Sequence, residues 1–330
     1  MNDEPVCEQI VDPSIEVSVE HHASSPTPFF PKKKLFLKNP KVRIVAVVLV
    51  LLIGFLLMTW QVYAKPVTDP FVRRVVQIVP YPALSVDGTT LSMKDFLTEY
   101  DSLNRYFESL EGQTAVPPAD QLEIAIVDTL VNKLAIQQLA KKYGVTLDQD
   151  RVETYYQDIL SSQESEEIFA QNLQETFGWT SEEFKTRIVD SIVLALQMTD
   201  TVLNNEEIQK DRLDLIQKAS ERVKTGEDFE TVAKEVHEQF DGIESDLGFI
   251  QSSVIPESWV SQVQSLEVDG VTEMITLPEG YVIFKLAERT GVDEDTQLHL
   301  LSITVPKQNL EEVVDVYLDT VTVKRYVGEK

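Results

Sequence analysis

Residues Asp228–Leu286 read DFETVAKEVHEQFDGIESDLGFIQSSVIPESWVSQVQSLEVDGVTEMITLPEGYVIFKL, and a second stretch near the C-terminus, Gln297–Val305, reads QLHLLSITV. Asp228 is well suited to cap a helix, because an aspartate carboxylate accepts the free N–H groups of a first helical turn. A second helix that carries Trp259 is expected next, followed by a strand over Tyr281–Leu286 after a Pro-Glu-Gly turn. We interpret the first stretch as a small α/β module that holds an extended peptide.

The composition bounds the size of the chain and excludes several kinds of function. At 330 residues there is room for two domains of about 150 residues each. The formal net charge of −26 argues against binding to nucleic acid, which needs a positive field. Cys7 is the single cysteine, so neither an intrachain disulfide nor a cysteine-rich zinc site can form. The histidines are His21, His22, His237 and His299, and from this small set we expect neither a metal nor another cofactor; His237 is expected at a solvated helix end.

A charge-free stretch of 21 residues, Ile44–Ala64, is long enough to cross a lipid bilayer, because about 20 apolar residues in a helix span about 30 Å of hydrocarbon. Six basic residues precede it between positions 32 and 43, whereas only Lys65, Arg73 and Arg74 closely follow it. The positive-inside rule then predicts a single-pass protein of the cell membrane, with a cytoplasmic N-terminus and residues 65–330 outside. A cleaved signal peptide and a buried soluble helix are the competing interpretations, and the late start and the length of the stretch favour the span.

The segments that flank this span are expected to carry little regular structure. Residues 1–43 hold six acidic and six basic residues and are rich in Pro, Ser and Glu, so we predict a disordered cytoplasmic tail. Residues 65–83 contain four prolines and are predicted to form a stiff, partly extended linker. Within this linker, residues 71–79 fit either a strand or a short juxtamembrane segment, and the sequence leaves both open.

A helical domain is predicted over residues 84–204. It opens with a β-hairpin around Asp87 and Gly88, a dipeptide that tolerates positive φ. Ser92 and Asp95 then form a capping-box pattern ahead of a helix. Four further helices are expected after it, because apolar residues recur every three or four positions. Asn205 is expected to cap one more helix, over residues 206–224.

Two motifs in this domain carry a resemblance to a known group of proteins. Leu139–Val145 reads LAKKYGV at the end of a helix, and Gly178–Lys185 reads GWTSEEFK. In their order after the hairpin and the capping box, they resemble the N-terminal helical domain of the SurA, PrsA and PpiD group of bacterial extracytoplasmic chaperone-isomerases. The resemblance covers residues 84–330, and it implies that the chain binds unfolded or extended polypeptides.

The module that follows, residues 205–305, is similar to a parvulin-type prolyl isomerase domain. The similarity rests on four motifs in order: TGEDF (225–229), SDLGF (245–249), LEVDGV (266–271) and GYVIFKL (280–286). It implies an α/β domain with an antiparallel sheet, and hence an α+β fold for the chain as a whole. It also implies that proline-containing segments are the substrate, with Leu247, Ile255 and Trp259 lining the pocket for the proline ring. That these three residues are ordinary core is the alternative.

The polar half of the implied site departs from the family pattern. Parvulins usually carry one histidine on the first strand of the module and another on the last strand, where this chain has Val282. The family's Cys or Asp before the SDLG motif matches loosely to Asp241. A first strand is missing before residue 206, and Gln297–Val305 is the candidate to replace it. We therefore hypothesise a circularly permuted module, in which this segment pairs with Tyr281–Leu286 and brings His299 to the first histidine's position. The implied catalytic residues are then His299 and Asp241.

The sequence supports three functional hypotheses. The first is a membrane-anchored foldase that isomerises Xaa-Pro bonds in exported proteins. The second is a chaperone of the same build that holds clients without catalysis, which Val282 favours. The third is a membrane-tethered scaffold for protein docking. The C-terminal extension, residues 306–330, is expected to begin as a helix and to end as a strand or a frayed end, and it docks on the helical domain or closes the module.

Overall fold

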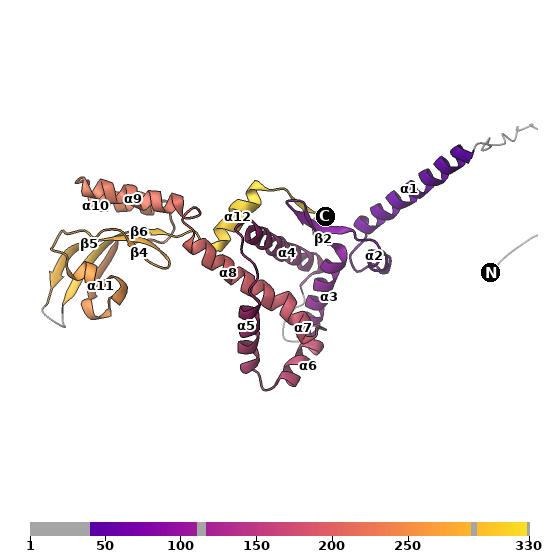
Figure 1. Cartoon of the computed structure of the whole chain (residues 1–330), viewed down its shortest axis with the longest axis horizontal. Coiled ribbons are helices and arrows are strands. Elements are labelled where there is room, and N and C mark those ends of the chain that lie inside the picture. Colours follow the sequence, from indigo (N-terminus) through magenta and orange to yellow (C-terminus); the bar gives the residue numbers. More distant parts are fainter. Residues whose placement is uncertain (1–39, 111–116, 292–295, 329–330) are drawn as a thin grey trace, which may run out of the picture. The chain divides into compact units, whose positions relative to one another are not determined.

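A computed structural model describes residues 40–110, 117–291 and 296–328 of the chain (Figure 1). The predicted disordered tail therefore lies almost wholly outside the described residues. The chain divides into two units, residues 1–58 and 59–330. The first helix, α1 (Pro40–Ala64), begins in the first unit. Over Lys41–Ala64 it is long and apolar enough to cross a membrane, and its most apolar window is not buried.

The segment left open between strand and juxtamembrane stretch is a helix, α2 (Pro70–Val76). Asp69 caps it, because its carboxylate accepts the N–H groups of Phe71 at 2.8 Å and Val72 at 3.4 Å. Proline at the first helical position costs no hydrogen bond, since that N–H has no partner inside a helix. Val72 and Val76 are buried, so this part of the predicted linker packs against the helical domain rather than acting only as a spacer.

The predicted hairpin is confirmed, and it belongs to a larger sheet. Strand β1 (Pro82–Val86) pairs with β2 (Thr89–Ser92) around Asp87 and Gly88, whose φ values are 46° and 79°. The free edge of β1 pairs antiparallel with β7 (Val323–Arg325), which gives the order β2-β1-β7. The end of the chain therefore completes the sheet of the N-terminal domain.

The helical domain follows the predicted pattern of caps and stops. Its elements are α3 (Met93–Ser109), α4 (Ala119–Lys142), α5 (Gln149–Ser161), α6 (Glu166–Thr176), α7 (Ser181–Phe184), a π-helical turn over Lys185–Val189 and α8 (Asp190–Asn204). Ser92 caps α3, and Thr180 forms a full capping box with Glu183 at the start of α7. Helix α12 (Leu310–Thr320) joins this domain, where its Val314 shares a buried cluster with Leu139 of α4 and Met198 of α8. The C-terminal extension thus docks on the helical domain.

The module begins with two helices and continues into a four-stranded sheet. Asn205 accepts the N–H groups of Glu207 and Ile208, but α9 (Lys210–Lys224) starts four residues later than expected. The remaining elements are α10 (Phe229–His237), β3 (Asp246–Gln251), α11 (Glu257–Gln264), β4 (Ile275–Thr276), β5 (Gly280–Thr290) and β6 (Gln297–Pro306). Asp228 caps α10 as predicted.

The sheet has the strand order β3-β6-β5-β4, with every neighbouring pair antiparallel. The predicted pairing of the C-terminal strand is confirmed, because β6 aligns with β5 from Tyr281 opposite Val305 to Thr290 opposite Gln297. β6 also lies between β3 and β5, so the last strand of the module fills a central place in the sheet. This central strand therefore comes from the C-terminal side of the module, as the permuted arrangement requires.

Strand alternation gives the sheet two apolar faces, because successive side chains of a strand point to opposite sides. On one face, odd-numbered residues such as Ile283 and Ile303 pack against helices α9 and α10. On the other face, even-numbered residues such as Phe284 and Leu300 pack with Ile255 and with residues of α11. Figure 1 shows α9 and α10 on one side of the strands and α11 on the other. The two faces have different neighbours, and this decides which side chains can act together.

Candidate peptide-binding site

Trp259 and Ile255 lie together on the α11 face of the sheet. The indole ring of Trp259 stacks on the ring of Phe284, with centroids 4.4 Å apart and planes 20° from parallel. Ile255 is 6% exposed and belongs to the same cluster, as does Val282 of β5. The structure thus brings together two of the three side chains expected to line a proline pocket. Leu247, the third, is 41% exposed on β3 and is not part of this cluster.

Two hydroxyl groups share this face with Trp259. The register places Thr304 opposite Val282 and Ser302 opposite Phe284. Since Ser302 and Thr304 have the same parity as Leu300 of the α11-face cluster, their side chains point to the same face. Ser302 is 2% exposed, and the Thr304 hydroxyl lies 3.5 Å from its oxygen. The polar groups beside the aromatic stack are therefore hydroxyls.

His299 occupies the opposite face of the sheet. It alternates with Leu300, so its ring points away from Trp259. Its Nε2 atom lies 2.8 Å from Oδ1 of Asp246, and its ring lies 4.9 Å from the ring of Phe249, centroid to centroid. The structure therefore separates the predicted catalytic histidine from Ile255 and Trp259.

The carboxylate that reaches His299 is Asp246, the first residue of the DLG motif. The same Oδ1 accepts the N–H of Gly248 at 2.8 Å. These contacts, first the Gly248 N–H and then His299, hold the pKa of Asp246 below its ordinary value. Asp241, predicted as the acidic catalytic residue, lies exposed in the turn between α10 and β3. The DLG motif was visible in the sequence, but its aspartate was not singled out.

His237 is buried, and the expectation of a solvated helix end was wrong. It is 7% exposed, and its Nε2 atom accepts the backbone N–H of Thr304 at 2.9 Å. An N–H group can only donate, so Nε2 carries no proton and the ring is held neutral. Burial lowers the pKa of His237. Its position could have been found from the sequence, because His237 lies one helical turn after Ala233 on the buried stripe of α10.

A polar cleft of about 730 Å³ lies beside His237, between α10 and the turn that leads into β3. Lys234 and Glu238 of α10 and Glu244 and Ser245 of the turn are among the residues that line it. Ser245 also accepts the N–H of Ser302 through its carbonyl oxygen, at 2.7 Å. Where β3 no longer pairs with β6, two other groups accept the N–H groups along this edge of β6. The Ser245 carbonyl accepts the N–H of Ser302, and the His237 imidazole accepts the N–H of Thr304. This closure fixes the end of β6 that carries Ser302 and Thr304.

Comparison with known families assigns the module to the prolyl isomerase class. Residues 192–288 match the family described as the PPIC-type PPIASE domain, or rotamase. The match ends at Glu288 within β5, before β6 begins. This is expected for a permuted module, because the strand that comes first in the family comes last in this chain.

Residues 35–198 match the family described as the SurA-like N-terminal domain. The chain thus combines a SurA-like N-terminal domain with a PPIC-type rotamase domain, and the rotamase domain gives it the role of a peptidyl-prolyl isomerase.

Among solved structures, the chain is similar to the foldase protein PrsA from Lactococcus lactis. The identity is 13% and the TM-score 0.25, over 72% of this chain and 86% of that chain. Similarity at this level does not define a common arrangement of domains. None of the curated proteins matches this sequence significantly.

Proposed function

We propose that the chain is a membrane-anchored foldase that isomerises Xaa-Pro bonds in extended segments of exported proteins. The observation that carries this proposal is the α11 face, where Trp259, Phe284 and Ile255 form an apolar surface beside two hydroxyls. A proline ring can pack on this surface, and the peptide chain on either side then lies near Ser302 and Thr304.

Isomerisation of an Xaa-Pro bond requires little covalent chemistry from the protein. Rotation about a peptide bond is opposed by a barrier of about 18–20 kcal/mol, which comes from amide resonance. An apolar surface removes water from the amide and so weakens the solvation that favours the planar, charge-separated form. A hydroxyl rotates to donate or to accept. The partly exposed Thr304 can therefore bind a peptide carbonyl, with the buried Ser302 beneath it.

A catalytic role for His299 and Asp241 is a separate proposal. It requires the peptide to bind on the opposite face of the sheet, where the exposed Phe249 lies beside His299. His299 and Asp246 would then supply the polar groups. Neither Ile255 nor Trp259 can contribute to a site on that face. The two proposals therefore predict different sensitive residues.

The anchor is proposed from the sequence of α1 and its flanks. The charge-free span and the basic residues before it favour insertion with a cytoplasmic N-terminus. Residues 65–330 would then meet their clients outside the cell membrane. Protease treatment of intact spheroplasts should digest residues 65–330 and leave the N-terminal tail protected. The reverse pattern would contradict the proposed orientation.

The test is a protease-coupled assay on chromogenic tetrapeptides that contain proline, with the full chain in lipid nanodiscs. We expect faster cis-to-trans conversion than in buffer with empty nanodiscs. Trp259→Ala should abolish most of the acceleration, whereas His299→Gln should retain it. Loss of activity in His299→Gln with full activity in Trp259→Ala would move the site to the opposite face.

One observation favours a second candidate, a chaperone that holds clients without catalysis. In the part of the chain that the structure describes, no imidazole lies on the Trp259 face, and Val282 stands where the family's last strand carries histidine. This candidate predicts suppression of client aggregation by the wild-type chain together with no acceleration of proline isomerisation.

A further inference from the structure

The last turns of α1 belong both to the proposed membrane span and to the folded domain. The charge-free stretch Ile44–Ala64 covers about 31 Å as a helix, so most of it is needed to cross about 30 Å of hydrocarbon. Residues 59–64, however, belong to the same unit as the helical domain. Val62 is 2% exposed, and the Tyr63 hydroxyl donates to the carbonyl oxygen of Pro82 at 2.9 Å. If α1 spans a bilayer, the domain surface around these residues therefore lies against lipid.

Aromatic side chains gather on this surface from three parts of the chain. The ring of Tyr63 lies 5.8 Å from the ring of Tyr81, just before β1, and 5.8 Å from that of Tyr326, just after β7. Trp60 is 68% exposed and Tyr326 is 39% exposed. Tryptophan and tyrosine are enriched where a membrane meets water, because each combines an apolar ring with a polar N–H or O–H group. The composition of this surface thus suits the headgroup layer of a bilayer.

The outer face of α2 adds apolar side chains beside a cation. Phe71, Arg74 and Ile78 recur at spacings of three and four residues, whereas Val72 and Val76 are buried. Phe71 is 37% exposed, and Ile78, in the turn after the helix, is 81% exposed. Exposed apolar side chains next to a basic residue are typical of segments that lie in a membrane interface. Helix α2 begins a few residues after α1 ends, so this face lies close in the chain to the proposed span.

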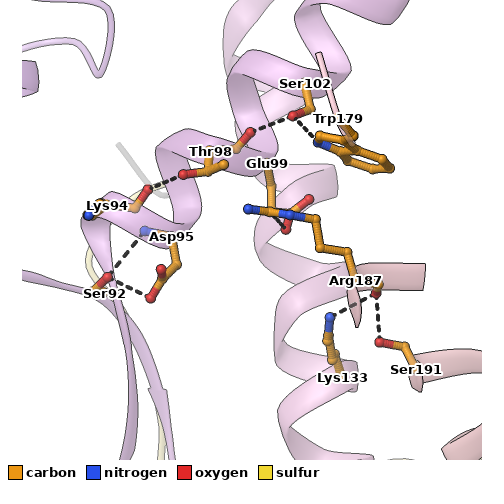
Figure 2. A network of polar contacts seen from close by, with 10 residues as sticks. All are labelled: Ser92, Lys94, Asp95, Thr98, Glu99, Ser102, Lys133, Trp179, Arg187 and Ser191. Atoms are coloured by element: carbon orange, nitrogen blue, oxygen red, sulfur yellow. Dashed lines mark hydrogen bonds and ion pairs between the residues drawn. The ribbon is translucent and has the colours of Figure 1, made fainter. Parts of the chain in front are cut away.

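Contacts with α3 hold α2 in a fixed orientation. Both terminal nitrogens of the Arg73 guanidinium donate to the Asp101 carboxylate, at 2.8 and 2.7 Å. Helix α3 is itself tied into the domain, because the Ser102 hydroxyl accepts the indole N–H of Trp179 at 2.7 Å (Figure 2). The exposed side chains of α2 therefore stand on a rigid support, and little conformational entropy is lost when they bind.

Basic residues distinguish this surface from the rest of an acidic chain. The net charge of the chain is −26, yet residues 65–80 hold Lys65, Arg73 and Arg74 against one acid, Asp69. Arg74 is exposed, and a guanidinium group matches the geometry of a phosphate. Since an acidic chain is repelled by an anionic bilayer, this local excess of positive charge selects the surface that faces the headgroups.

We propose that Trp60, Phe71, Arg74, Ile78 and Tyr326 form a lipid-binding surface that lies in the headgroup layer of the bilayer. The apolar side chains reach the boundary of the acyl chains, and Arg74 binds the phosphates. The domain is thereby held on the membrane instead of turning freely at the end of α1. The proposal rests on the membrane anchor proposed for α1, and it adds a lipid contact that a simple anchor does not require.

The test measures how close residue 78 lies to lipid, with the full chain in nanodiscs of phosphatidylcholine. In a Cys7→Ser background, Ile78→Cys carries a small fluorophore, and lipid with a spin-labelled headgroup quenches fluorophores that lie in the interface. Ile168→Cys is the matched control, because Ile168 is 41% exposed on α6 and is not part of the surface. We expect quenching at residue 78 to exceed that at residue 168 by roughly threefold or more.

Two substitutions test the chemistry of the contact through the label at residue 78. Phe71→Ser should reduce the quenching by roughly twofold, whereas Val316→Ser, at an exposed valine of α12, should leave it unchanged. Replacing part of the phosphatidylcholine by anionic phosphatidylglycerol should strengthen the quenching, and Arg74→Glu should remove this increase. Circular dichroism of the variants checks the fold.

Equal quenching at residues 78 and 168 would overturn the proposal, as would unchanged quenching in both Phe71→Ser and Arg74→Glu. Disulfide-linked dimers of unlabelled Ile78→Cys would also overturn it, because a second copy of the chain would then cover the surface. A chain that does not co-purify with nanodiscs overturns the anchor and the surface together. A chain that co-purifies but shows equal quenching at the two positions overturns only the surface. Proline isomerisation in Phe71→Ser should match wild type, because the surface uses no residue of the isomerase module.

Discussion

The indole of Trp259 lies stacked on the ring of Phe284, 4.4 Å away, and this contact ties α11 to the middle of the sheet. Phe284 is buried, whereas Trp259 is only partly so. The pair therefore presents a partly exposed indole ring on a buried aromatic ring. A proline ring that packs there meets a side chain whose orientation is already fixed, which lowers the entropy cost of binding.

Trp259→Ala should reduce kcat/KM for proline tetrapeptides by roughly tenfold or more, since losing about 1.4 kcal/mol of transition-state binding is a factor of ten. Trp259→Phe should recover most of the activity, because it keeps a ring over Phe284. Circular dichroism of both variants checks the fold. Equal activity of Trp259→Ala and wild type would exclude this ring from the site.

Thr304→Val should slow catalysis without unfolding the module, because valine has nearly the shape of threonine and lacks only the hydroxyl. One hydrogen bond contributes about 0.5–1.5 kcal/mol, so the expected loss is roughly twofold to tenfold in kcat. Ser302→Ala should act in the same direction through the contact with Thr304. The measurement is the protease-coupled rate, with His299→Gln as the variant that should remain near wild type.

The dependence of kcat on pH gives an independent test of the same face. Neither Ser302 nor Thr304 titrates near neutral pH, so the rate should be flat between about pH 6 and pH 8. A histidine that acts as acid or base would instead give a bell-shaped or sigmoidal profile in this range. A sigmoid that disappears in His299→Gln would assign catalysis to the opposite face.

Acid should destabilise the module through His237. Its neutral ring accepts the Thr304 N–H, and burial lowers the pKa of His237 in the folded chain below its ordinary value near 6.5. As pH falls through about 6.5, the unfolded chain takes up a proton on this residue before the folded chain does, so the free energy of unfolding decreases. The stabilisation is present above that pH and is lost progressively as pH falls toward the folded pKa.

The measurement for His237 is the urea midpoint of unfolding at pH 7.5 and pH 5.5. The midpoint should fall on acidification in wild type and in His299→Gln, and it should fall less in His237→Gln, whose amide oxygen can accept the same N–H. An NMR titration in which His237 has a pKa above 6.5 would contradict this account.

Local signals in the sequence were sufficient for most helices and for the β1–β2 hairpin, whereas the pairing of β6 with β5 was predicted from the resemblance to the parvulin fold. The caps at Ser92, Thr180 and Asp228 are short-range features, and a few residues determine each of them. The closure of the small sheet by Val323–Arg325 depends on contacts between the two ends of the chain. Such contacts leave no local pattern, and only a strand or a frayed end could be expected there.

The candidate site was harder to predict because it depends on register. A shift of one residue in a strand moves every side chain to the other face. The run HLL favoured His299 as the residue beside the pocket, but the observed register places Ser302 opposite Phe284 and His299 on the α10 side. The residue types were visible in the sequence, but the pairing that decides their face was not.

Gln209 links the two domains through backbone groups, and its removal should be costly. It is 1% exposed, and its amide nitrogen donates to the carbonyl oxygens of Val202 at 2.9 Å and Gln308 at 3.0 Å. Its amide oxygen accepts the N–H of Gln308 at 2.9 Å. Gln209→Leu removes these hydrogen bonds, each of which contributes about 0.5–1.5 kcal/mol. Hydrogen exchange should therefore show faster exchange of the Gln308 amide and of the start of α12.

Gln308→Ala is the matched control, because these contacts use only its backbone, and its exchange should stay close to wild type. Equal protection in Gln209→Leu and Gln308→Ala would show that the packing of α12 on α4 and α8 holds the junction without Gln209.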